Sequence, residues 1–222
     1  MRQTYYTEGS IAEQSTKLLN SLPNKHSGSM QEFISNQVAL LILDMQRYFL
    51  SPESHAFVPS AMSILPGIQR LIGKFLDIQR PILLTRHINT NRDAGVMSVW
   101  WNDLINPDDE NSRIIPELMP YNLDVIEKSQ YDAFYHTDLE EILRKHGVKQ
   151  IVITGVMTHL CCETTARSAF VRGFDVYFPV DGTATYNEAF HKATLLNLSH
   201  GFAHIVTVDE ILAQMRGIDE PP

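Results

Sequence analysis

Two adjacent cysteines, Cys161 and Cys162, are the residues of this 222-residue chain best suited to nucleophilic chemistry. They follow the apolar run QIVIT and precede an Ala- and Thr-rich stretch of helical character, which places them at a predicted strand-to-helix turn. Unpaired backbone N–H groups and the positive end of a helix dipole lower the pKa of a thiol at such a turn. The alternative is that both are small buried residues, because free cysteine is among the most buried residue types.

Two charged residues also stand where apolar runs end. Asp44 ends VALLILD, and Lys128 ends DVIEK. Each has a simpler explanation, because Asp is a common N-cap and most lysines are solvated. If the strands are parallel, however, their carboxyl ends meet at one edge of the sheet. An acid or base, a cation and a thiol would then lie together, and this combination suits nucleophilic attack on a carbonyl group.

The pattern that positions these residues is an alternation of apolar strands and amphipathic helices. Near-continuous apolar runs are typical of strands buried on both faces. Strands are predicted over 38–44, 81–87, 124–128, 150–154, 175–180 and 203–208, and helices over 64–75, 138–146, 161–171, 187–199 and after 207–209. This order predicts an α/β fold, with a doubly wound, mainly parallel sheet and helices on both faces. The stretch 87–121, which holds both tryptophans, is predicted to be a lid or binding loop.

Length, charge and cysteine content limit the organisation and the partners. Residues 1–36 are predicted to be an N-terminal extension that wraps the domain or is partly disordered, and residues 37–222 a single domain. The net charge of −8 and the pI of about 5.5 argue against nucleic acid or an anionic membrane as a partner. Adjacent cysteines cannot staple a fold, which favours a reducing compartment. With no leader pattern and no apolar run near the roughly 20 residues that span a bilayer, a cytoplasmic protein is expected.

Three ordered motifs lie between Val38 and Leu212: LLILDMQRYF, EKSQYDAFYHTDLEEIL and ITGVMTHLCCETTARSAFVRGFDVYFPVDGTAT. In these motifs the chain resembles the isochorismatase-like cysteine hydrolases, a superfamily that includes nicotinamidases, carbamoylsarcosine amidases and isochorismatases. The resemblance implies a Rossmann-type, three-layer α/β fold and a small-molecule substrate. It also implies a homodimer or a larger homo-oligomer.

The resemblance further implies a catalytic triad. The Asp–Lys–Cys triad of the family falls on Asp44, Lys128 and Cys161 of this chain. The family motif Gly-x-x-Thr-x-x-Cys places the nucleophile three residues after Thr158, so Cys162 would point away into packing.

The mechanism of the family gives further expectations. Lys128 and the helix N-terminus would hold Cys161 as, or close to, a thiolate. Asp44 would accept the thiol proton and return it to the leaving amine. A non-proline cis peptide is implied at Val156–Met157, and the backbone N–H groups of Met157 and Cys161 would stabilise the oxyanion.

The histidines carry no strong metal signal. Nicotinamidases bind a metal through an aspartate and histidines after the second strand, where this chain reads TRHINTN. His87 alone is a poor metal site, so no catalytic metal and no other cofactor are predicted. His200 and His204 have the spacing of a helical metal pair. Gly201 lies between them at a predicted helix end, which favours surface or packing roles instead.

Two reactions remain open within the resemblance. Isochorismatases cleave a vinyl ether by protonation from the aspartate and commonly have Gly at the nucleophile position, whereas this chain keeps Cys161. Hydrolysis of an amide or carbamoyl C–N bond is therefore favoured. Vinyl-ether cleavage with Asp44 as general acid is the alternative. Two minor alternatives are a family member that binds a ligand without catalysis and a sensor of thiol oxidation.

Aromatic residues near the predicted strand ends could wall an apolar substrate pocket. The candidates are Phe49, Trp100, Trp101, Tyr131 and Phe134, of which Trp100 and Tyr131 are favoured and the two phenylalanines are explained equally well as core. Arg86 and His87 could bind a substrate carboxylate, or Arg86 could form an internal ion pair. His159 could contact the substrate, or it could pack at the helix start.

Overall fold

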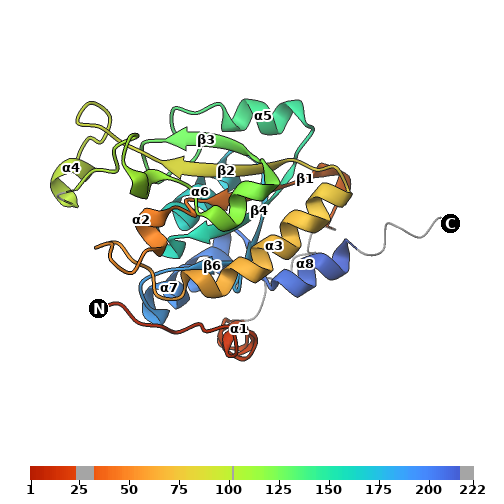
Figure 1. Ribbon diagram of the computed structural model, residues 1–222. Coiled ribbons are helices and arrows are strands. Elements are labelled where there is room, and N and C mark those ends of the chain that lie inside the picture. Colours follow the sequence, from red (N-terminus) through yellow and green to blue (C-terminus); the bar gives the residue numbers. More distant parts are fainter. Residues whose placement is uncertain (24–32, 102, 216–222) are drawn as a thin grey trace.

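The computed structural model describes residues 1–23, 33–101 and 103–215. Within these residues, seven strands form one sheet in the order β3-β2-β1-β4-β5-β7, with β6 beside β4 (Figure 1). Each pairing between these strands is parallel. The strands are β1 (Val38–Leu43), β2 (Ile82–His87), β3 (Asp124–Lys128), β4 (Gln150–Val156), β5 (Asp175–Pro179), β6 (Thr183–Ala184) and β7 (His204–Val206).

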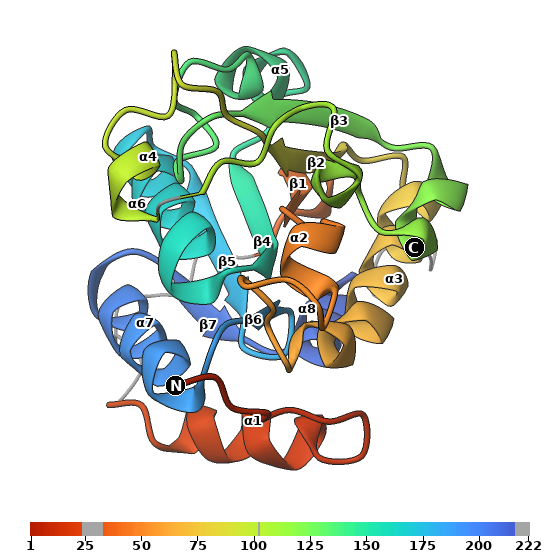
Figure 2. The same ribbon diagram turned by 60° about the vertical axis from the view of Figure 1, so that its left-hand side comes forward.

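Helices cover both faces of this sheet. Helices α3 and α8 pack together on one face, and α6 and α7 pack together on the other (Figure 2). The helices are α1 (Ile11–Asn20), α2 (Arg47–Leu50), α3 (Ala61–Asp77), α4 (Met97–Trp100), α5 (Leu139–Lys145), α6 (Glu163–Val171), α7 (Glu188–Gly201) and α8 (Val208–Gln214). The predicted doubly wound, three-layer α/β fold is confirmed.

The apolar runs explain this layering. Every residue of β1 and of β4 is buried, so both strands need cover on each side of the sheet. Helix α3 supplies that cover with a stripe of buried residues at helical spacing: Ile64, Leu65, Ile68, Leu71, Ile72 and Phe75. Strand β3 lies at the edge of the sheet, and three of its five residues are exposed.

The strand order reverses between β1 and β4. From β1 the chain builds outward through β2 to β3, and it then returns to place β4 on the other side of β1. Ligands of open α/β sheets bind at such a reversal, outside the carboxyl ends of the strands. Asp44 directly follows β1, and the turn with the two cysteines directly follows β4.

The N-terminal residues share the core of the sheet. This part of the chain forms helix α1. The buried cluster that contains the strands also includes three N-terminal residues, Tyr5, Tyr6 and Leu18. The sequence did not predict this helix. Residues 24–32 lie outside the described part, so the boundary between an extension and a domain remains a prediction. Among the helices that the structure describes, none is long and apolar enough to cross a membrane.

Candidate active site

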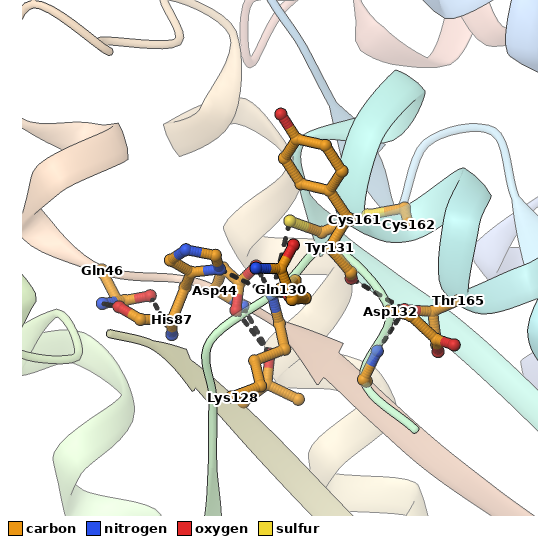
Figure 3. A network of polar contacts seen from close by, with 12 residues as sticks. Asp44, Gln46, His87, Lys128, Gln130, Tyr131, Asp132, Cys161, Cys162 and Thr165 are labelled. Atoms are coloured by element: carbon orange, nitrogen blue, oxygen red, sulfur yellow. Dashed lines mark hydrogen bonds and ion pairs between the residues drawn. The ribbon is translucent and has the colours of Figure 1, made fainter. Parts of the chain in front are cut away.

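Four neighbouring strands each bring one reactive or polar side chain to the strand-order reversal. Asp44 follows β1, His87 ends β2, Lys128 ends β3, and Cys161 lies in the turn after β4 (Figure 3). Adjacent strands lie about 4.8 Å apart, so Lys128 must reach across β2 to contact the residue after β1. Its long side chain does so, and Nζ lies 2.8 Å from Oδ2 of Asp44.

Lys128 is the centre of the site. Besides Asp44, its buried Nζ contacts the Gln130 carbonyl at 3.0 Å, Nδ1 of His87 at 3.1 Å and Sγ of Cys161 at 3.4 Å. Burial lowers the pKa of Lys128, but the Asp44 carboxylate, Cys161 and the hydrogen bonds to both together outweigh burial and raise that pKa above its usual value. The lysine is therefore a cation held between the carboxylate and the thiol.

Asp44 is held as a carboxylate. Its Oδ1 accepts a hydrogen bond of 2.6 Å from the Thr85 hydroxyl, and its backbone has a positive φ of 51°. Aspartate adopts this left-handed conformation more readily than most residues. Burial raises the pKa of Asp44, but Lys128, His87 and hydrogen bonds together bring that pKa below its usual value.

His87 belongs to this charged network. Burial, together with the nearby Lys128 cation, lowers the pKa of His87 to about 3, so the ring is neutral and its Nδ1 accepts from Lys128. Gln46 fixes the end of β2 from both sides: it accepts from the His87 N–H at 2.7 Å and donates to the His87 carbonyl at 2.9 Å. A neutral ring could bind a substrate carboxylate only as a hydrogen-bond donor, so that role of His87 remains a prediction.

Cys161 lies in a π-helical turn, Thr158–Cys162, that follows a cis peptide bond at Val156–Met157, as the resemblance implied. The carbonyl of Met157 closes the turn by accepting from the N–H groups of Leu160 at 3.0 Å and Cys162 at 3.2 Å.

A glycine before this turn lets the carboxyl ends of β1 and β4 approach closely. Gly155 has a φ of 102°, and a Cβ there would lie 2.1 Å from the Leu43 carbonyl oxygen. No side chain is compatible with that approach.

The ionisation of Cys161 differs from the expectation. Burial, followed by the Asp44 carboxylate, raises the pKa of the Cys161 thiol to about 12, and Lys128 only partly opposes this effect. Burial therefore favours a protonated thiol over the expected thiolate, and Sγ lies within 4.8 Å of the Asp44 carboxylate. Its sulfur points toward Asp44 and Lys128, whereas Cys162 lies on the other side of the turn, fully buried (Figure 3).

The same residues form a potential donor set for a metal. Ligand atoms of Asp44, His87 and Cys161 all lie within 4.8 Å of one another. The Lys128 ammonium lies among them, within 3.4 Å of each, and takes the place that a metal ion would need. This donor set therefore does not fit a metal in the described arrangement. That the reaction needs no metal remains a prediction.

A pocket opens above the thiol. It encloses about 530 Å³ including its open mouth, and Cys161, His87 and Met157 contribute to its lining. Aromatic rings form much of the remaining wall: Tyr48, Phe49, Trp101, Tyr131 and Tyr186. Predominantly apolar, aromatic walls with few polar groups are typical of sites for small unsaturated molecules.

Of the two favoured aromatic residues, the structure places one in the pocket and the other on the surface. Tyr131 lines the pocket, and its hydroxyl accepts a hydrogen bond of 2.6 Å from the indole of Trp101. Trp100 instead lies on the surface with 78% of its area exposed, so Trp101 and not Trp100 is the tryptophan of the pocket. Consecutive residues of a helical turn point in different directions, which is why the neighbours differ. Phe134 stacks on Phe174 in the core.

Arg86 and His159 have structural partners instead of facing the pocket. Side chains alternate along a strand, so Arg86 points away from the face that His87 occupies. Its guanidinium pairs with Glu127 at 3.0 Å and donates to the Ser112 carbonyl, which makes it the internal ion pair of the two alternatives. His159 stacks on Phe190 at 4.4 Å between centroids, as the packing alternative predicted.

Sequence reasoning missed a polar cluster at the pocket wall. The Tyr48 hydroxyl lies 2.8 Å from Asp103 and 2.5 Å from His55, and His55 lies 3.0 Å from Asp103. His55 and Asp103 stand in loops without a motif, so no sequence pattern pointed to them. His204 pairs with Asp175 at 2.8 Å, which agrees with its predicted packing role.

The fold is a doubly wound α/β sheet with a buried Asp–Lys–Cys group at its strand-order reversal, and comparison with known proteins gives its family. The model of the isochorismatase domain matches residues 38–210, so the chain belongs to the isochorismatase family. It is 38% identical to Nicotinamidase 3 of Arabidopsis thaliana over 205 residues, which cover 90% of this chain and all of that protein.

Two further relatives extend the comparison. The isochorismatase of Bacillus subtilis is 29% identical over 184 residues, which cover 82% of this chain but 59% of that protein. In fold, the chain is similar to a cysteine hydrolase from Pseudomonas syringae pv. phaseolicola 1448A, with a TM-score of 0.81 and 24% identity, covering 89% of this chain and 99% of the other. The protein is therefore a hydrolase of the isochorismatase family.

Proposed function

We propose that this protein hydrolyses the C–N bond of a small planar amide, with Cys161 as nucleophile. The observation that supports this best is a buried thiol within 4.8 Å of the Asp44 carboxylate, with Lys128 in contact with both, at one end of an aromatic pocket. A resemblance of 38% to a protein named a nicotinamidase, over that protein's whole length, supports the same reaction class.

The first step is attack by sulfur on the amide carbon. As the C–S bond forms, the thiol proton passes to the Asp44 carboxylate and the carbonyl electron pair moves onto oxygen. Because the thiol is protonated at rest, proton transfer to Asp44 has to accompany the attack. The backbone N–H groups of Met157 and Cys161 would stabilise the oxyanion, and one such donor contributes about 3–4 kcal/mol in known cases.

The second step releases the amine. Asp44 returns its proton to the leaving nitrogen, the C–N bond breaks, and the acyl group stays on Cys161 as a thioester. A water molecule then gives a proton to Asp44 and attacks the thioester carbon. Collapse of that intermediate releases the carboxylic acid, and the Asp44 proton restores the thiol. Lys128 stabilises the Asp44 carboxylate each time it reforms.

The pocket favours a flat substrate. Rings of Trp101, Tyr131 and Tyr186 can pack against a planar group, and the apolar lining disfavours a strongly charged one. Aromatic and heteroaromatic primary amides therefore come first among the candidates, and nicotinamide is the first compound to test.

Vinyl-ether hydrolysis is the second candidate, supported by the 29% identity to an isochorismatase. That reaction needs Asp44 to carry a proton, whereas the pKa of Asp44 lies below its usual value. An oxidation sensor needs an accessible thiolate, and the pKa of Cys161 is raised to about 12 in a buried position. Both alternatives therefore have weaker support than amide hydrolysis.

The test is ammonia or amine release from a panel of amides, carbamoyl compounds and ureides, with isochorismate hydrolysis measured in parallel. Cys161→Ala is expected to abolish amine release. Cys162→Ala is the matched control, since it removes the adjacent thiol, and it should retain most of the activity. Isochorismate cleavage that survives Cys161→Ala would refute the proposal and leave Asp44 acting alone as an acid.

A further inference from the structure

The first seven residues cross the domain before α1 begins. Figure 2 shows this segment starting beside α7 and running toward α1. Tyr5 and Tyr6 are buried, with 7% and 0% of their area exposed. Both of their backbone N–H groups donate to the hydroxyl of Ser60, just before α3, at 3.0 Å each. One buried side chain of the core thus holds the backbone of two successive residues of this segment.

The Tyr5 hydroxyl joins two segments that flank the active site. It accepts a hydrogen bond of 3.0 Å from the backbone N–H of Thr185. It also lies 3.2 Å from Nδ1 of His191. Thr158 itself lies 3.0 Å from the same nitrogen. Thr185, His191 and Thr158 are all buried, so His191 links Tyr5 to Thr158 inside the core.

The direction of these hydrogen bonds follows from His191. Its Nε2 lies 3.1 Å from the Val180 carbonyl, which can only accept, so Nε2 carries the ring proton. Burial lowers the pKa of His191 to about 3, so the ring is neutral and Nδ1 must be an acceptor. The hydroxyls of Thr158 and Tyr5 then both donate to Nδ1, so this one buried nitrogen joins the two residues.

Thr158 is where this chain of bonds meets the site. It is the first residue of the π-helical turn, directly after Met157 and three residues before Cys161. Movement of Thr158 would therefore displace both the thiol and the backbone N–H groups assigned to the oxyanion.

A second contact ties the same segment to the pocket wall. The N–H of Gln3 donates to the Tyr186 carbonyl at 2.7 Å, and the Arg2 guanidinium lies 5.4 Å from the centre of the Tyr186 ring. Tyr186 lines the pocket. Two residues of the N-terminal segment thus reach the wall, while Tyr5 reaches the nucleophile turn.

We propose that Tyr5 is a positioning residue of the active site: acting through Thr158 and His191, the N-terminal segment holds the turn that presents Cys161. This inference rests on the proposed function, since the turn matters only if Cys161 is the nucleophile. It assigns a catalytic consequence to a segment that lies far from the triad in sequence.

The test compares two neighbouring tyrosines. Tyr5→Phe and Tyr6→Phe each remove one buried hydroxyl from adjacent rings, but the Tyr6 hydroxyl bonds to the Val180 carbonyl and to the far nitrogen of His191. Tyr5→Phe is expected to lower kcat about tenfold with KM changed less than about twofold. Tyr6→Phe should lower the melting temperature as much as Tyr5→Phe does, but it should keep kcat within about twofold of the wild-type value. Equal losses of kcat from both variants would overturn the proposal, because they would indicate a general loss of packing.

A double-mutant cycle tests the route through Thr158. If Tyr5 acts through Thr158, the pair Tyr5→Phe and Thr158→Val should be no slower than Thr158→Val alone. Multiplying losses would mean that Tyr5 acts elsewhere and would refute the inference.

Hydrogen exchange separates this inference from the proposed reaction, because it needs no substrate. The amides of residues 157–162 should exchange several-fold faster in Tyr5→Phe than in the wild type. In Tyr6→Phe their exchange rates should equal those of the wild type. If the wild type hydrolyses no amide, the proposed function fails while this readout still tests the positioning of the turn. Unchanged exchange in Tyr5→Phe would overturn the positioning role, whatever the substrate.

Discussion

The Lys128 ammonium lies 2.8 Å from the Asp44 carboxylate, although the strands that carry them are separated by β2. Both side chains are fully buried. Removing one partner of a buried pair leaves the other charge without compensation, which costs about 3–5 kcal/mol. The pair therefore links the ionisation of the site to the stability of the fold.

Lys128→Met should expose this link. We expect activity to fall more than about a hundredfold and the free energy of unfolding to fall by about 3–5 kcal/mol. Urea denaturation and amine release measure the two effects. Adding Asp44→Asn removes the uncompensated charge, so the double variant should regain most of the stability and none of the activity. A double variant no more stable than Lys128→Met would contradict this account of the pair.

The pH dependence of catalysis should show a protonated nucleophile. Because the pKa of Cys161 is raised to about 12 and that of Asp44 is lowered, neither group titrates near neutrality. We expect kcat/KM to stay flat between about pH 6 and 9. A rate that rises through about pH 8.5, as for an ordinary thiol, would instead indicate attack by a preformed thiolate.

Stability should decrease in mild acid. His87 and His191 each have a pKa of about 3 in the folded protein, whereas an unfolded histidine titrates near about 6.5. Between these values the unfolded state binds more protons, so stability is full above about pH 6.5 and declines as the pH falls toward 3, by up to about 1.4 kcal/mol per unit for each histidine.

Urea midpoints measured from about pH 7 to 5 check this slope. His191→Gln keeps a donor for the Val180 carbonyl and should reduce the slope by about half. A wild-type stability that does not change over this range would rule out the two neutral histidines.

The two tryptophans offer a matched pair for the pocket. Trp101→Ala removes a lining ring and should raise KM about tenfold, while Trp100→Ala removes a surface ring and should change KM little. Steady-state kinetics on the best amide of the panel decide the matter. The reverse order of effects would mean that Trp100 folds over the bound substrate.

Gly155→Ala should destabilise the fold far more than the addition of one methyl group would suggest. A Cβ there would meet the Leu43 carbonyl at 2.1 Å, so the change should cost more than about 4 kcal/mol or prevent folding. Gly73→Ala is the control, since it lies within α3 with open space around it and should be neutral or slightly stabilising. Thermal unfolding of the two variants compares them, and a folded, stable Gly155→Ala would contradict the close approach.

The strand ends were predictable because they are local signals. Short strand-like runs that end in Asp44 or Lys128 mark the points where β1 and β3 leave the sheet, and parallel topology then gathers their ends. The choice between Trp100 and Trp101 was not predictable, because it depends on one short helix within a long loop. The ionisation of Cys161 depends on burial by distant segments. The role proposed for Tyr5 depends on its contact with His191, which lies 186 residues away in the sequence.

The position of β3 has a consequence for how the protein loses function. In the part of the chain that the structure describes, β3 pairs along one side only, with β2, and more than half of its residues face solvent. Edge elements detach at a lower free energy than the whole domain unfolds. Because Lys128 ends this strand, its detachment would remove the cation and leave the sulfur, the carboxylate and the remaining sheet in place. Inactivation under stress would then be a local, reversible event that precedes denaturation.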